Sequence, residues 1–169
     1  DLAIMDHLLD QHRVAISATA NGFLTGSPEN MAHLTVQYDG GAVAHLNVNW
    51  LAPVKIRQTL VGGSRKMVVY DDMQTSEKVK IYDRGASCGD GPYEHLVSYR
   101  LGDMSAPALS SKEALLTEVE EFVRSIQSGT APLTDGQGGL RVVEMLAAAS
   151  QSTRLRGHPV DLVTLKEAS

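Results

Sequence analysis

The sequence has 169 residues, a formal net charge of −5 and 43% hydrophobic residues, which suffices for one domain with its own core. Its lysines and arginines are scattered, and no apolar run reaches the length of a membrane span, so we expect neither a nucleic-acid nor a membrane partner. The single cysteine, Cys88, excludes an intramolecular disulfide framework and fits a reducing compartment, so we expect a cytoplasmic protein.

The chain opens with a predicted helix, because apolar residues recur there at helical spacing: Leu2, Met5, Leu8 and Leu9. The sequence has no initiator methionine and no signal-like segment before this helix, so we expect it to be part of a longer polypeptide. Residues 13–24 alternate as an extended segment, and residues 27–30 have the composition of a turn.

Two alternating runs on either side of Asp39-Gly40-Gly41 predict a β-hairpin. A three-residue loop places Val36 opposite Ala44 and Leu34 opposite Leu46, whereas a two-residue loop would pair apolar with polar residues. The three-residue loop is therefore our prediction. The opposite face then carries polar, mostly uncharged side chains: His33, Thr35, Gln37, His45, Asn47 and Asn49.

Further strands are expected after Pro53, which marks an edge, a bulge or a bend. If the register continues, apolar Val54, Ile56 and Leu60 extend one face and Lys55, Arg57 and Thr59 the other. Strands are predicted at 66–70, 78–82 and 97–101, with a Gly-rich irregular loop at 84–95.

Two helices are predicted near the end of the chain. The first is capped by Ser110 or Ser111 with help from Glu113, has the apolar stripe Leu115, Val119, Phe122, Val123 and Ile126, and stops at Gly129. The second is capped by Asp135, buries Leu140, Val143, Leu146 and Ala147, and ends at Gly157 before Pro159. A short strand is predicted at 160–163. Strands in the middle and helices at both ends predict an α+β fold, a largely antiparallel open-faced sheet with helices packed on one face.

The residues alone offer no self-contained catalytic site. No Gly-x-Gly-x-x-Gly fingerprint follows a strand, and Gly136, Gly138 and Gly139 have the wrong spacing for one. His33 and His45 share the polar face diagonally, but no Asp, Glu or Cys joins them, so we expect interface hydrogen bonding rather than a metal site. Asp71-Asp72 is interpreted as a solvated strand end rather than a cation site.

Five segments, in order, resemble the C-terminal domain of the Gfo/Idh/MocA oxidoreductases, the family of glucose–fructose oxidoreductase and inositol dehydrogenase. They are Asp1–Met5, Asp39–Ala42, Asn49–Arg57 (Asn-Trp-Leu-Ala-Pro-Val-Lys-Ile-Arg), Val61–Asp72, and Thr134-Asp135-Gly136 with Gly139–Val143. The branch that acts on nucleotide-activated sugars is the most similar.

The resemblance implies a dihydrodipicolinate reductase-like C-terminal domain over 1–169 that binds substrate and assembles dimers or tetramers through its open sheet face. A Rossmann domain outside this sequence would bind NAD or NADP, and we expect this chain alone to bind neither. The family's catalytic lysine, aspartate and histidine would also lie outside, the histidine just before Asp1. We therefore expect no catalytic, cofactor or metal residue here, and an inactive chain.

Four residues are candidates for binding the anionic groups of a sugar-type substrate: Lys55, Arg57, Tyr99 and Arg100. Two other functions stay open at this point. The chain can be a stand-alone assembly or binding module, or part of a family member with other chemistry, such as NAD-dependent glycoside cleavage.

Overall fold

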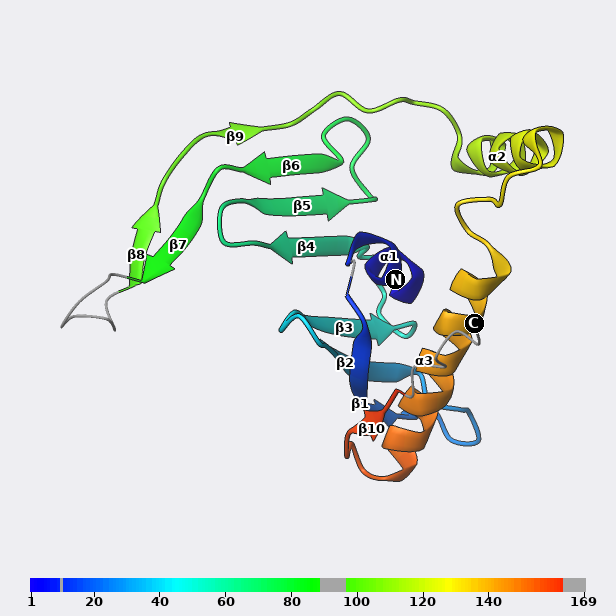
Figure 1. Cartoon of the computed structure of the whole chain (residues 1–169). Coiled ribbons are helices and arrows are strands. Elements are labelled where there is room, and N and C mark those ends of the chain that lie inside the picture. Colours follow the sequence, from blue (N-terminus) through cyan, green and yellow to red (C-terminus); the bar gives the residue numbers. More distant parts are fainter. Residues whose placement is uncertain (10, 89–96, 163–169) are drawn as a thin grey trace. The chain divides into compact units, whose positions relative to one another are not determined.

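A computed structural model describes residues 1–9, 11–88 and 97–162, and the chain forms two compact units (Figure 1). The first unit comprises Asp1–Pro53 and Glu118–Ser169, and the second comprises Val54–Thr117. Each unit has its own antiparallel sheet, so each is described separately.

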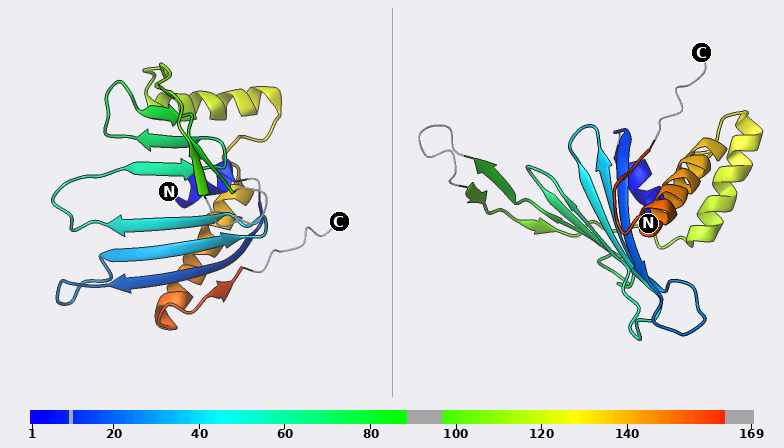
Figure 2. Two further views of the ribbon diagram at one scale, coloured as in Figure 1. Left: turned by 90° about the vertical axis from the view of Figure 1, so that its left-hand side faces the viewer. Right: turned by 90° about the horizontal axis from the view of Figure 1, so that it is seen from below.

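The first unit contains the predicted opening helix and a four-stranded antiparallel sheet. Its strand order is β10-β1-β2-β3. The elements are α1 (Leu2–Leu8), β1 (Arg13–Asn21), β2 (Met31–Tyr38), β3 (Val43–Asn49), α3 (Gly136–Arg154) and β10 (Val160–Asp161). Figure 2 shows α1 and α3 on the same side of these strands. The opposite side of the sheet is exposed at His33, Gln37 and His45.

The β2–β3 hairpin confirms the predicted register. Val36 pairs with Ala44 and Leu34 with Leu46, and the loop consists of residues 39–41. Gly41 has a φ of +83°, the left-handed conformation that glycine adopts at little cost. The apolar side chains of this hairpin are buried and form the core with Ile16 and Met145.

Helix α3 begins where predicted, because the Asp135 carboxylate accepts a hydrogen bond from the Gly138 N–H at 2.8 Å. Its predicted buried face is wrong. Four predicted core residues are exposed: Leu140, Val143, Leu146 and Ala147. The buried residues are instead Met145, Ala148, Ala149 and Ser152. Small side chains let the helix approach β1 closely, a contact that a search for large apolar residues does not find.

A carboxylate joins three elements of the first unit. Asp6 of α1 lies 2.8 Å from the Nε of Arg141 on α3 and 3.4 Å from an Nη of Arg13 on β1. The Asp6 side chain is only 12% exposed and that of Arg13 only 13% exposed. The hydrogen bond that Arg141 donates to Asp6 raises the pKa of the Arg141 guanidinium. The ion pairs fix α1 against the sheet and α3.

Helix α2 (Ala114–Ser128) spans the boundary between the two units. It starts two or three residues later than capping by Ser111 or Ser110 predicts, because the Ser110 hydroxyl accepts from the Lys112 N–H in a turn before the helix. Gly129 has a φ of +66° and ends it as predicted. Its apolar stripe is exposed at Leu115, Val119, Phe122, Val123 and Ile126.

The second unit contains a four-stranded antiparallel sheet of order β4-β5-β6-β9 and a separate two-stranded sheet. The strands are β4 (Gln58–Gly62), β5 (Met67–Asp71), β6 (Val79–Tyr82), β9 (Met104–Ser105), β7 (Gly85–Cys88) and β8 (Val97–Arg100). β7 lies inside the predicted irregular loop and β9 was not predicted. The rest of that loop, 89–95, lies outside the described residues.

The predicted continuation of the apolar face after Pro53 is wrong. Residues 50–57 form no strand, and the side chains of Val54, Ile56 and Leu60 are exposed. Because Pro53 lacks an N–H group and its ring fixes φ, the chain leaves the first sheet here, and β4 pairs with β5 instead.

The α+β class and the antiparallel pairing are confirmed. Among the described helices, none has the length and hydropathy needed to cross a membrane.

Candidate functional site

The uncovered face of the first sheet carries mostly polar side chains, with Ala15, Met31 and the exposed Val43 as its apolar residues. Register places Ser17, Thr35 and His45 in one row, and Thr19, His33 and Asn47 in the next. No Lys, Arg, Asp or Glu of β1, β2 or β3 lies on this face, which we call the open face. At the sheet edge, Asp161 of β10 pairs with Ala15 and adds one carboxylate.

The two histidines of the open face lie diagonally, as predicted, since His33 pairs with Asn47 and His45 with Thr35. The Thr35 hydroxyl and the Nδ1 of His45 are 3.1 Å apart and share a hydrogen bond. Within residues 1–9, 11–88 and 97–162, no group of three or more His, Cys, Asp and Glu is arranged to hold a metal ion.

The second unit holds Arg57 in a cluster around one carboxylate. Asp72 lies 3.5 Å from an Nη of Arg57 and 3.4 Å from the Nζ of Lys78. The Tyr70 hydroxyl donates to the same carboxylate at 3.0 Å. Chiefly because of the Tyr70 hydrogen bond, and then that of Lys78, the pKa of Asp72 is lowered. Two cations around one carboxylate leave the cluster with a net positive charge.

Arg100 lies in a different ion pair. One of its Nη atoms is 2.8 Å from the Asp83 carboxylate and also donates to the carbonyl of Arg65 at 2.5 Å. The hydrogen bond from Arg100 lowers the pKa of Asp83. Arg100 therefore joins β8 to the residues that flank β5 and β6.

The two arginine clusters lie at opposite ends of the β5–β6 hairpin. Asp72 directly follows β5 at the end where Tyr70 pairs with Val79, whereas Asp83 directly follows β6 at the end where Met67 pairs with Tyr82. At about 3.3 Å per residue, the five residues of β5 separate them by roughly 15 Å. The four predicted substrate residues are therefore not gathered at one point.

Lys55 and Tyr99 are the other two predicted substrate residues. Lys55 lies in the irregular stretch before β4 and is exposed. Tyr99 lies on β8 next to Arg100, and 77% of it is exposed. Both are accessible to a ligand.

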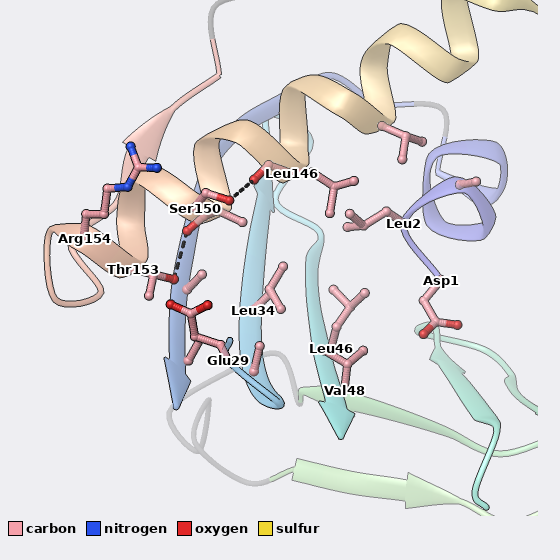
Figure 3. A pocket seen from close by; sticks show the side chains of 16 residues that line it. Asp1, Leu2, Glu29, Leu34, Leu46, Val48, Leu146, Ser150, Thr153 and Arg154 are labelled. Carbon is pink, nitrogen blue, oxygen red and sulfur yellow. Dashed lines mark hydrogen bonds between the residues drawn. The ribbon is translucent and has the colours of Figure 1, made fainter. Parts of the chain in front are cut away.

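A groove that the sequence did not predict lies between α3 and the sheet of the first unit (Figure 3). Its volume is about 600 Å³, and its floor is apolar, with Leu34, Leu46 and Val48 from the strands. Glu29 and Thr153 lie at one end and Asp1 and Leu2 at the other. The exposed side chain of Leu146, expected in the core, lines this groove instead.

Residues 1–162 match the family described as "Oxidoreductase family, C-terminal alpha/beta domain" of the Gfo/Idh/MocA proteins. The chain belongs to this family. The resemblance of the five sequence segments is thereby confirmed, and the second unit, the open face and both arginine clusters fall within the matched residues.

Solved structures share the fold at low sequence identity. UDP-N-acetylglucosamine 3-dehydrogenase from Acidithiobacillus ferrooxidans is 24% identical, with a TM-score of 0.66 over 91% of this chain and 45% of that one. The aldose-aldose oxidoreductase from Caulobacter crescentus is 18% identical, with a TM-score of 0.70 over 95% and 44%. An NAD binding oxidoreductase from Klebsiella pneumoniae is 16% identical, with a TM-score of 0.73 over 96% and 48%.

The chain spans about half the length of the solved structures that it matches. Comparison with curated proteins finds none that matches. Two further solved structures that share the fold are described as an NAD-binding protein from Listeria innocua and an NADPH-dependent oxidoreductase from Desulfitobacterium hafniense.

Proposed function

We propose that this chain is the substrate-side and oligomerisation domain of an NAD(P)-dependent oxidoreductase that acts on a hydroxyl of a sugar or nucleotide-sugar. The observation that carries the proposal is the family match over residues 1–162. Two of the similar structures are named as enzymes of UDP-N-acetylglucosamine and of aldoses, which supports the substrate class. A cytoplasmic location, testable by cell fractionation, belongs to the same proposal.

The cofactor would bind to a domain outside these 169 residues. When bound, NAD(P) supplies the hydride acceptor of such a reaction. The glycines at the start of α3 do not fit a dinucleotide, because the Gly138 N–H, where a phosphate would meet the helix, already donates to the Asp135 carboxylate. No step that involves the cofactor is therefore assigned to the described residues.

Titration of this chain with NADH, followed by nucleotide fluorescence, tests whether the cofactor binds to a separate domain. We expect no saturable binding to the chain alone and micromolar to millimolar binding to a protein that contains both domains. Tight saturable binding to the chain alone would disprove a separate cofactor domain.

Arg57 is proposed to bind an anionic group of the substrate. Its side chain is 62% exposed, and the cluster that it forms with Lys78 and Asp72 has excess positive charge. Arginine suits phosphate and carboxylate because its planar fork can donate two parallel hydrogen bonds.

Steady-state kinetics of the two-domain enzyme test this role. Arg57→Ala should raise the KM for the sugar substrate about tenfold or more, as loss of a charge-assisted hydrogen bond does, and change the cofactor KM little. Lys80→Ala is the control, because Lys80 of β6 pairs with Glu77 and not with Asp72. Equal effects of Arg57→Ala on both KM values would exclude Arg57 from the substrate site.

The open face is proposed to bind a second copy of the chain. A surface without Lys, Arg, Asp or Glu on β1, β2 and β3 is compatible with its own copy, whereas a charged surface would repel it. The Ser, Thr, Asn, Gln and His side chains supply directional hydrogen bonds across such an interface.

Sedimentation velocity tests the assembly. Asn47→Lys should dissociate it because two copies of the new charge would face each other. Gln151→Lys on α3, exposed and outside the open face, should leave it unchanged. An unaltered sedimentation coefficient for Asn47→Lys would contradict the proposed interface.

A further inference from the structure

We propose that protonation of His33 and His45 controls assembly through the open face: the copies associate when both imidazoles are neutral and separate when they are charged. The inference rests on the proposed homo-oligomer interface and adds its regulation. It depends on where the two histidines lie and on which charges surround them.

The two histidines lie on neighbouring strands of the open face, one of which, β3, is at the edge of the sheet. His33 is on β2, the second of the three long strands, and His45 is on β3. As diagonal neighbours on one face of an antiparallel pair, their α-carbons are about 7–8 Å apart. Both are exposed in the single chain, so both would be covered when a second sheet packs on this face.

The open face has almost nothing to neutralise a charged imidazole. The neighbours of the histidines in their rows are Ser17, Thr19, Thr35 and Asn47, none of which titrates in the physiological range. The Thr35 hydroxyl can accept a hydrogen bond from a protonated His45, but it carries no negative charge.

Charged groups on the surrounding elements lie elsewhere. Arg13 of β1 lies on the other face, beside Asp6. Asp39, in the hairpin loop, accepts from the His12 N–H at 3.1 Å. Asp161 of β10 pairs with Ala15 at the sheet edge, in the row beyond Ser17, and β1 and β2 lie between β10 and β3. No described carboxylate of this sheet therefore pairs with His33 or His45.

A two-fold interface doubles the number of imidazoles that meet between the two copies. Self-association brings the same patch of both copies together, so four imidazoles meet between sheets that pack about 10 Å apart. Protonation would place a positive charge on each of them, and the copies would then repel each other across a face on which β1, β2 and β3 supply no carboxylate. The dissociation constant should therefore rise at least about tenfold between pH 7.5 and pH 5.5.

Sedimentation velocity of the chain at pH 7.5 and pH 5.5, with circular dichroism to confirm folding, tests the proposal. The double variant His33→Asn/His45→Asn keeps hydrogen-bonding capacity without a titrating group. The matched control is His7→Gln/His158→Gln, whose two residues are exposed and lie outside β1, β2 and β3.

The expected result is that the parent chain and the control dissociate at pH 5.5, while the double variant stays associated. Association of the parent chain at both pH values would overturn the histidine switch and leave the proposed interface intact. Dissociation of the double variant at pH 5.5 to the same extent as the parent would also overturn the switch. A monomer at both pH values would overturn the interface itself.

Discussion

The Oγ of Ser152 accepts a hydrogen bond from the backbone N–H of Ala18 at 2.8 Å and donates one to the carbonyl of His158 at 2.7 Å. One fully buried hydroxyl thus joins α3, β1 and the turn that follows the helix. Both backbone groups would lose their partner together if this hydroxyl were removed.

Ser152→Ala should lower the free energy of unfolding by about 1–3 kcal/mol, because it leaves buried polar groups unpaired. Urea denaturation measures the loss. Ser150→Ala on the same helix is the control, since the Ser150 hydroxyl is exposed and bonds only to the carbonyl of Leu146 within the helix. Equal stability of the two variants would show that water replaces the Ser152 bonds.

Asp6→Asn should lower the free energy of unfolding by about 3 kcal/mol, because it leaves the largely buried Arg13 guanidinium without its counter-charge. Thermal denaturation measures the effect. Glu77→Gln removes the more exposed pair with Lys80 and should change stability by less than about 0.5 kcal/mol. A similar small change for Asp6→Asn would mean that Arg13 finds another partner.

Tyr38→Phe should not destabilise the protein, because the buried Tyr38 hydroxyl has no hydrogen-bond partner in the described structure. Tyr70→Phe should destabilise it, since the Tyr70 hydroxyl donates to Asp72. Urea denaturation at neutral pH compares the two variants, and a large loss for Tyr38→Phe would contradict the unpaired hydroxyl.

The raised pKa values of Tyr38 and Tyr70 should make the stability of the fold depend on pH in the alkaline range. Burial is the main cause that raises the pKa of both, so folding favours the neutral phenol. Their contribution is complete below the ordinary value near 10 and is lost as pH rises through the folded-state pKa. In an ultraviolet titration, part of the tyrosinate absorbance should therefore appear at a higher pH than for free tyrosine. This high-pH part should be smaller in Tyr38→Phe.

Arg100→Gln should raise the pKa of Asp83 toward its ordinary value near 3.9, because the arginine hydrogen bond is the main cause of the lowered pKa. Since the folded-state pKa lies below the unfolded one, the pair stabilises the protein above that value, and this stabilisation is lost as pH falls through the folded-state pKa. Carboxyl NMR titration measures the shift.

Lys66→Gln is the matched variant for Asp83, because Lys66 lowers the same pKa only through a smaller, longer-range attraction. It should shift the titration less than Arg100→Gln. A larger shift from Lys66→Gln would reverse the assigned order of causes.

The hairpin was predictable because alternation and loop length both act within 20 residues of sequence, so Val36 and Ala44 could pair in one register only. The face of α3 was not predictable, because Ser152 is polar and is buried by a hydrogen bond to β1, 134 residues away in the sequence. The candidate site was predictable only as residue types: the partners of Arg57 and Arg100 depend on the pairing of β4, β5 and β6, which follows a break at Pro53.

The three-residue loop at Asp39, Gly40 and Gly41 also makes the length of this turn matter more than its composition. A chain lacking one of these residues would present the alternate side chains of β3 to α3, with His45 and Asn47 toward the core and Leu46 toward solvent. One codon lost in this turn would therefore remove the open face and the hydrophobic core together, whereas an exposed side chain changed on either strand would affect only its own row.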